Sequence, residues 1–221
     1  MRTLLLRADL HIHTIYSKDS GATPKSIVDQ CLKAGLDCIA ITDHNSIQGA
    51  LEVQRMAPFK VIVGEEVKSS HGDIIGLFLK EEIPSLMAPL ETAQAIKAQD
   101  GLVMVPHPFD RVRPSALGWD IFQELAPWVD IIETFNARNL FEGDDNRAVE
   151  AARKYGLLFA VVSDAHTAKE LGRTYNEMPD FDGSPQGFKE ALAQATLVTR
   201  RTPFVYRLAP AYARLTRPFR P

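Results

Sequence analysis

The sequence has few cysteines, and this scarcity excludes a disulfide-stabilised scaffold. Its 221 residues include only two cysteines, Cys31 and Cys38, and neither pairs with a nearby histidine at the spacing of a zinc finger. One cysteine falls in an expected helix and the other in an expected strand. We therefore expect two buried thiols in a reducing compartment rather than a disulfide or a metal site.

The sequence also lacks a segment that could enter a membrane. The apolar run near the N-terminus is interrupted by Arg7 and Asp9, so it is too short and too charged for a signal peptide or a spanning helix. No other run is long enough to cross a bilayer. We expect a cytoplasmic protein with no membrane partner.

An excess of positive charge is absent as well. The formal net charge is -3, so no overall basic field attracts long nucleic acid. An anionic substrate would have to be held by local charge, for example by bound metal ions.

The remaining composition is typical of one globular domain, with 45% hydrophobic and 24% charged residues. Short β-rich runs alternate with helical stretches, which predicts an α/β fold with a parallel sheet, closed or open, and crossover helices. Strands are expected at residues 4–13, 37–42, 60–67, 73–79, 102–105, 129–135, 157–162 and 197–198. Helices are expected at residues 24–35, 46–57, 88–100, 121–125, 144–155 and 187–195.

The C-terminal tail differs in composition from the rest of the chain. From Arg200 onward it contains six arginines and no acidic residue, together with prolines and aromatics. This composition favours an extension that clasps the protein surface over an arm that binds nucleic acid. We therefore divide the chain into one domain over residues 1–199 and an Arg/Pro-rich extension over residues 200–221.

Five of the six histidines share one kind of position, because they follow or end four different expected strands: His11, His13, His44, His107 and His166. His11 and His13 point to one face of their strand, since side chains two residues apart share a face. Asp164 and His166 share a face for the same reason. The sixth histidine, His71, lies in a polar turn.

This distribution of histidines predicts a metal site. A single histidine at a strand end is usually a polar cap, but five of them at four strand ends are hard to explain in that way. Imidazole and carboxylate ligands suit Zn, Mn or Fe. In an α/β barrel, the rim at the C-terminal ends of the strands is where active sites are built.

The motifs DLHIHT, ITDHN, GEE, VPHP and SDAH, in this order between Asp9 and His166, resemble the polymerase and histidinol phosphatase (PHP) superfamily of metal-dependent phosphoesterases. The resemblance implies an α/β fold built as a distorted seven-stranded, TIM-like β/α barrel in a single domain. It also implies two or three divalent transition-metal ions (Zn, Mn or Fe) as cofactors.

Position by position, the resemblance implies metal ligands at His11, His13, Asp19, His44, Glu66, Asp73, His107, Asp164 and His166. Glu66 matches the family's Gly-x-Glu pattern, whose glutamate bridges two metals, and Glu65 is a near rival. Many members have histidine at the position of Asp73. His71 could substitute for Asp73 if the turn folds differently, but we favour Asp73 because a carboxylate can still bind a metal.

Several further residues are candidates for a supporting role. Arg111, Arg113 and Arg138 follow strand ends and could clamp a phosphate through two parallel hydrogen bonds, with Arg138 favoured because it lies beside the rim. Asp43 is expected to point away from His44 and to support the site through other residues, without binding the metal itself. Asp9, deeper in the first strand, is expected to form buried hydrogen bonds.

The expected reaction is hydrolysis of a phosphate ester by a water that the metals activate. Asp164 or His166 would protonate the leaving group, and Arg138 would bind the phosphate. A small phosphorylated substrate or a short nucleotide fits best, because the chain lacks a basic track. The alternatives are an exonuclease or oligonucleotide phosphodiesterase and a non-catalytic, metal-binding regulatory domain. The sequence leaves the oligomeric state open.

Overall fold

The computed structural model describes residues 5–216 of the chain. Expectations for Leu4, at the start of the first strand, and for Arg217 and Arg220, in the extension, lie outside the described residues. Among residues 5–216, no helix has the length and apolar character that a membrane span needs.

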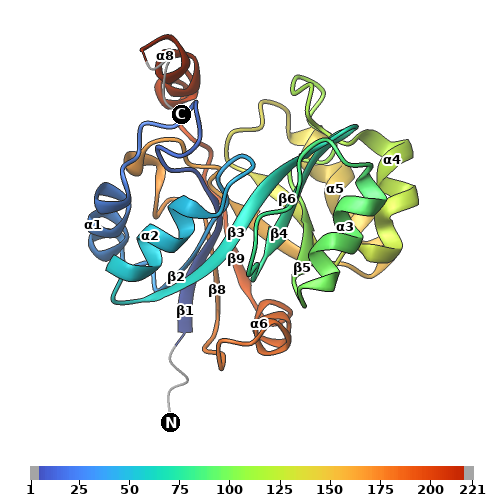
Figure 1. Ribbon diagram of the computed structural model, residues 1–221, viewed down its shortest axis with the longest axis horizontal. Coiled ribbons are helices and arrows are strands. Elements are labelled where there is room, and N and C mark those ends of the chain that lie inside the picture. The colour runs from blue at the N-terminus through green and yellow to red at the C-terminus, as the bar shows by residue number, and fades with distance from the viewer. Residues whose placement is uncertain (1–4, 217–221) are drawn as a thin grey trace.

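The described residues form one mixed sheet with helices on its outer surface (Figure 1). The strands are β1 (Leu5–Ile12), β2 (Cys38–Ile41), β3 (Lys60–Ser69), β4 (Gly72–Leu77), β5 (Leu102–Val105), β6 (Ile131–Asn136), β7 (Leu158–Val162), β8 (Tyr175–Pro179) and β9 (Thr196–Val198). The helices are α1 (Pro24–Ala34), α2 (Gln48–Met56), α3 (Pro89–Ala98), α4 (Gly118–Leu125), α5 (Glu142–Tyr155), α6 (Pro185–Leu192), α7 (Phe204–Arg207) and α8 (Ala209–Thr216). Short 3₁₀ helices occupy Ala126–Trp128 and Ala168–Glu170.

The sheet corrects two expectations. Its strand order is β7-β6-β5-β4-β3-β2-β1-β8-β9, so the described residues contain nine strands and the expected number of seven is wrong. Parallel pairing holds for β1–β2, β2–β3, β5–β6 and β6–β7, whereas β4, β8 and β9 are antiparallel to their neighbours. The short turn between β3 and β4 cannot return the chain for a parallel pair, which needs a long crossover. Each strand and helix expected from the sequence is present, with bounds shifted by a few residues, but β8, α7 and α8 were not predicted.

The sheet closes almost completely into a barrel because β1 and β7 meet beside β8. Ile12, the last residue of β1, forms an isolated parallel bridge with Ala165, which follows β7. Lower down, the buried side chain of Asn176 on β8 accepts from Val161 N at 3.0 Å and donates to the carbonyls of Ala8 and Val161 at 3.1 and 2.8 Å. The side-chain amide of Asn176 thus connects β1 and β7, which are not neighbours in the backbone hydrogen-bond ladder.

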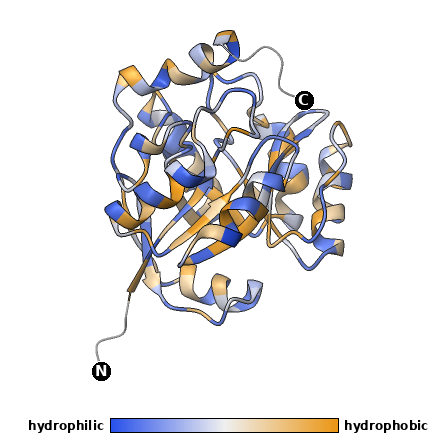
Figure 2. Ribbon diagram, turned by 60° about the vertical axis from the view of Figure 1, so that its left-hand side comes forward, coloured by the Kyte–Doolittle hydropathy of each residue, from blue (hydrophilic) through white to orange (hydrophobic). Residues whose placement is uncertain are grey.

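The core consists of an interior layer and an outer layer. Apolar residues from β1 to β8 fill the barrel, and Phe188 of α6 packs edge-on against Phe78 and Phe181. In Figure 1, α6 lies at the end where β1 begins, and α8 lies at the opposite end. The outer layer lies between the strands and helices α1–α5. In Figure 2 the central strands are mainly hydrophobic, whereas the surrounding helices combine hydrophilic and hydrophobic residues. Cys31 and Cys38 are buried free thiols, as expected.

Replacing Asn176 should destabilise the fold where the barrel closes. Asn176→Ala leaves one N–H group and two carbonyls without partners in a buried place, so we expect the free energy of unfolding to fall by about 3 kcal/mol. Chemical denaturation of both proteins measures this change. Asn146→Ala on the exposed side of α5 is the control and should change the free energy by less than about 0.5 kcal/mol. An equal effect of the two substitutions would contradict a closing role for Asn176.

Candidate metal centre

The expected ligands lie at the rim formed by the C-terminal ends of the parallel strands. Three groups of residues each have ligand atoms within 4.8 Å of one another. His13 belongs to two of these groups, and Glu66 also belongs to two. The groups are His13, His44 and His166; His11, His13 and Glu66; and Glu66, Asp73 and His107. Asp19 and Asp164 lie beside them, within 3.7 Å of histidine nitrogens. The fold therefore brings all nine residues together.

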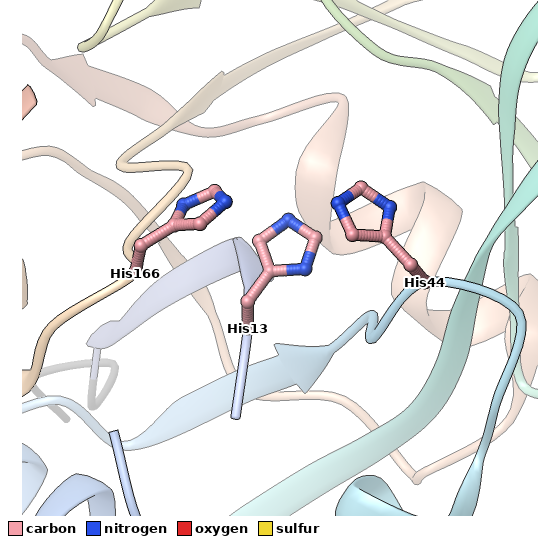
Figure 3. Close-up of side chains that lie close together, drawn as sticks. All are labelled: His13, His44 and His166. Atoms are coloured by element: carbon pink, nitrogen blue, oxygen red, sulfur yellow. The ribbon is translucent and has the colours of Figure 1, made fainter. Parts of the chain in front are cut away.

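Three histidines from distant parts of the chain face one another across this rim. Figure 3 shows the rings of His13, His44 and His166 pointing toward a common space. The ring centre of His13 is 4.6 Å from that of His44 and 4.3 Å from that of His166. Nδ1 of His166 donates to the carbonyl of Asp164 at 2.9 Å, which leaves its Nε2 with a free lone pair.

His11 and His13 show that the site fits a cation. Nδ1–H of His11 donates to Glu133 at 2.6 Å, so Nε2 carries the lone pair whenever the ring is neutral. Nδ1–H of His13 donates to Ser17 at 3.1 Å, because the Ser17 hydroxyl proton is given to Asp43 at 2.6 Å. The two Nε2 atoms are nevertheless 2.9 Å apart. Two lone pairs at this separation repel each other, so the contact needs positive charge, either a proton on one ring or a metal ion that both nitrogens would bind.

Glu66 lies at the centre of the cluster. Oε2 is 3.0 Å from Nδ1 of His44 and 3.3 Å from Nε2 of His13, and Oε1 is 3.1 Å from Nε2 of His107. One carboxylate thus reaches both sides of the site, as a bridging ligand must. Glu65 points to the other face of β3, where it accepts from Ile83 N at 2.8 Å and where burial raises its pKa to about 7.

Among the nine expected ligands, two carboxylates carry an oxygen that is buried and has no hydrogen-bond partner among the described residues. These oxygens are Oδ1 of Asp19 and Oδ1 of Asp164. Oδ1 of Asp164 lies 3.5 Å from Nε2 of His13, and the backbone of Asp164 has a φ of 50°, which is uncommon for residues other than glycine. Buried carboxylate oxygens need a positive partner, and metal ligation supplies one.

Charge within the protein partly compensates for these acids. Burial opposes ionisation of Asp164, but the Arg113 guanidinium at 2.7 Å, followed by His11, holds its pKa well below the usual range. Burial also opposes protonation of His11, yet Asp164, Glu133 and Glu66 raise the pKa of His11 well above its usual value. A proton on His11 would stand in for part of a metal's charge, so metal binding should release protons.

The structure places Asp73, rather than His71, beside Glu66 and His107. His71 remains in the turn after β3, where Nδ1 lies 2.9 Å from the hydroxyl of Ser70. Burial and the nearby Glu66 raise the pKa of Asp73, as expected for two acids that would share a cation.

The three candidate arginines occupy different environments. Arg113 and Arg138 line the pocket above the cluster, whereas Arg111 pairs with Asp144 at the start of α5. Arg138 donates to Glu170 at 2.6 Å. Asp43 holds the loop after β1 through Thr14 and Ser17, in agreement with the supporting role that we expected.

Glu133 contacts two of the expected ligands, and the sequence interpretation missed it. Besides holding Nδ1 of His11, it accepts from His107 N at 2.8 Å and from Asn136 Nδ2 at 2.9 Å, so it orients two expected ligands. A glutamate is rarely fully buried unless it is paired. Its place directly after two isoleucines of an apolar strand was the available signal.

The opposite orientations of Glu65 and Glu66 give a matched test of the metal centre. Glu66→Gln removes the charge that reaches both sides of the cluster, so we expect at least one metal ion per chain to be lost. Glu65→Gln should retain the metal content of the unaltered protein. Elemental mass spectrometry after purification without chelator measures both values. Loss of metal in Glu65→Gln alone would contradict the placement of the two residues.

Replacing Glu133 should weaken metal binding without removing a ligand. Glu133→Gln leaves a neutral acceptor for His11 and reduces the basicity of its Nε2, so we expect a 10- to 100-fold lower metal affinity. Competition with a chromogenic chelator measures the affinity. The control is Asp130→Asn, which makes the same kind of exchange just before β6. Equal metal affinities of the unaltered protein, Glu133→Gln and Asp130→Asn would contradict the orienting role.

Comparison with known proteins agrees with this geometry. A model of the PHP domain matches residues 9–196. Two uncharacterized proteins of Methanocaldococcus jannaschii are similar in sequence: one is 34% identical over 85% of this chain and 79% of its own length, and the other 41% identical over 60% and 82%. A solved two-domain protein from Bacteroides vulgatus, described as containing a predicted PHP-like metal-dependent phosphoesterase, has a TM-score of 0.70 at 21% identity over 96% of this chain and 70% of that one. The resemblance found in the motifs is confirmed, and the chain belongs to the PHP domain family.

Proposed function

We propose that this protein hydrolyses small phosphomonoesters with a metal-activated water. The observation that carries the proposal is the position of the ligand groups at the floor of a pocket of about 660 Å³ with a cationic wall. The cationic side chains of the wall are Lys68, Arg113, Arg138, Arg207 and Arg214. A volume of this size suits one small molecule, and the cations favour an anionic one.

Divalent ions bound by the nine expected ligands would lower the pKa of a water and neutralise the phosphoryl oxygens. Two or three ions of Zn, Mn or Fe suit the mixture of imidazole and carboxylate. Arg113, held between Asp164 at 2.7 Å and Asp110 at 3.5 Å, keeps a fixed cation beside the ligands. It is well placed to bind a phosphoryl oxygen.

We expected Asp164 or His166 to protonate the leaving group, but despite burial the Arg113 guanidinium holds the pKa of Asp164 well below its usual range, which favours the ionised carboxylate. Nδ1–H of His166 is committed to the carbonyl of Asp164, so its Nε2 suits a metal ligand or a proton acceptor better than a proton donor. Arg138 lies in the pocket wall, and its salt bridge with Glu170 orients the guanidinium. This preorganisation favours phosphate binding by Arg138, as the sequence suggested.

Loss of a ligand should abolish hydrolysis of a generic aryl phosphate. With 4-nitrophenyl phosphate, we expect His11→Ala and Asp164→Ala to lower kcat/KM by at least about a hundredfold, because the activated water depends on the metals. Release of 4-nitrophenol, measured with the metal content of each variant, tests this. Removing the metal with a chelator should abolish the release of 4-nitrophenol. Adding the metal back should restore it.

The same metal-replete protein should be assayed on labelled RNA and DNA oligomers. We expect slow or no cleavage, because long strands need an extended basic track. Stepwise shortening of oligomers with negligible monoester hydrolysis would favour the exonuclease alternative. Bound metals without turnover on either class would favour the regulatory domain.

A further inference from the structure

The C-terminal extension forms part of the pocket wall. The family model ends at residue 196, and residues 200–216, which we call the C-terminal wall, continue over the rim of the barrel. Thr202 N donates to the carbonyl of Ala137 at 2.9 Å, and Arg201 donates to that of Asn136 at 2.7 Å. Asn136 is the last residue of β6 and Ala137 follows it, so both contacts are made at the end of this strand. These bonds hold the segment beside the pocket that contains the expected ligands.

Arg138 connects the C-terminal wall to the interior of the pocket. Its guanidinium donates to the carbonyls of Tyr206 and Arg207 at 3.5 and 3.3 Å. At the far end of the wall, Arg214 of α8 forms an ion pair with Asp19 at 2.7 Å. The wall therefore contacts both a candidate phosphate-binding arginine and an expected metal ligand.

Arg207 differs from the other arginines of the pocket. Each of the other three is paired with a carboxylate: Arg113 with Asp164, Arg138 with Glu170 and Arg214 with Asp19. Arg207 forms no ion pair with any described residue. It donates instead to the carbonyls of Thr202 and Asn139, each at 3.3 Å.

These carbonyl bonds orient Arg207 without neutralising it. Burial, followed by the neighbouring cations Arg138 and Arg201, lowers the pKa of Arg207, yet an arginine keeps its proton at neutral pH. The charge of Asp110 opposes this lowering of the pKa, but Asp110 forms no ion pair with Arg207. A preoriented guanidinium without a paired carboxylate is suited to bind an anion, particularly a planar carboxylate or a phosphate.

Apolar side chains lie in the same pocket although they are accessible to water. Phe204, Leu208 and Val112 are 69%, 55% and 54% exposed, and all three line the pocket together with Leu140. Exposed apolar groups gathered around a cavity are typical of a surface that contacts the body of a ligand.

We propose that Arg207 binds a second anionic group of the substrate, separate from the phosphoryl group at the metals. The substrate is then a phosphomonoester with an apolar body and a second anion, either a carboxylate or another phosphate. This inference rests on the proposed function, because the phosphoryl end is assigned to the metal centre. The C-terminal wall determines specificity, and the barrel carries the chemistry.

Binding of non-hydrolysable probes tests this assignment without turnover. The probes are 3- and 4-carboxyphenylphosphonate and their carboxamides, which differ from the acids chiefly in the second charge. With protein that retains its metals, calorimetry should give roughly tenfold or tighter binding for at least one acid over its amide. Arg207→Gln should reduce that preference to about onefold while leaving the affinity for the amide unchanged.

Two control variants locate the effect. Arg200→Gln removes an exposed arginine of the same segment that does not line the pocket, so it should keep the full preference. Lys68→Gln removes the other pocket cation that has no ion pair among the described residues, and it should also keep the preference. Equal binding of acids and amides by the unaltered protein, no binding of any probe, or loss of the preference in Lys68→Gln but not in Arg207→Gln would overturn the proposal.

A second readout separates this inference from the proposed function. The ratio of kcat/KM for 4-carboxyphenyl phosphate to that for its carboxamide should follow the binding preference in each variant. Failure of all phosphates to react, with the binding preference intact, would refute the hydrolase and leave Arg207 as an anion site. Hydrolysis of both esters with no preference in binding or rate would refute the role of Arg207 alone.

Discussion

The structure depends on one electrostatic constraint at the rim of the barrel: buried acids and imidazole lone pairs converge there and need positive charge. Nε2 of His11 and Nε2 of His13 are 2.9 Å apart, and Glu66 touches both sides of the cluster. These groups belong to strands and strand ends, and the register of the ladder brings them together. The free energy needed to gather like groups comes from the apolar core below them.

Protein cations and protons supply part of the missing charge. Arg113 lies against Asp164, Arg214 against Asp19, and the raised pKa of His11 indicates a proton on that ring. These substitutes are weaker than divalent ions, since each brings only one charge and Arg214 is largely exposed. Metal binding therefore has to displace protons and rearrange ion pairs.

The sequence predicted the family, the existence of each main strand, and the set of residues that meets at the rim, because strand-end histidines form a strong local pattern. It did not predict β8 (Tyr175–Pro179), whose segment contains charged and polar residues and ends in proline. Its role becomes visible only when Asn176 joins β1 to β7 across many intervening residues. Glu133 was missed for a similar reason, since its partners His11 and His107 lie on other strands. The ligand roles of the nine residues and the phosphate-binding role of Arg138 stay predictions until a metal and a substrate are bound.

The C-terminal wall can accept substitutions that the strands carrying the expected ligands cannot. The expected ligands belong to strands and strand ends held by the closed sheet, so moving one of them disturbs the whole barrel. Residues 200–216 lie outside that ladder and are held to the chain after β6 by a few bonds, such as those of Thr202 and Arg138. Substitutions on this segment can alter the charge and shape of the pocket while the metal centre stays intact. Arg214 is the exception, because its ion pair with Asp19 couples the wall directly to the metal site.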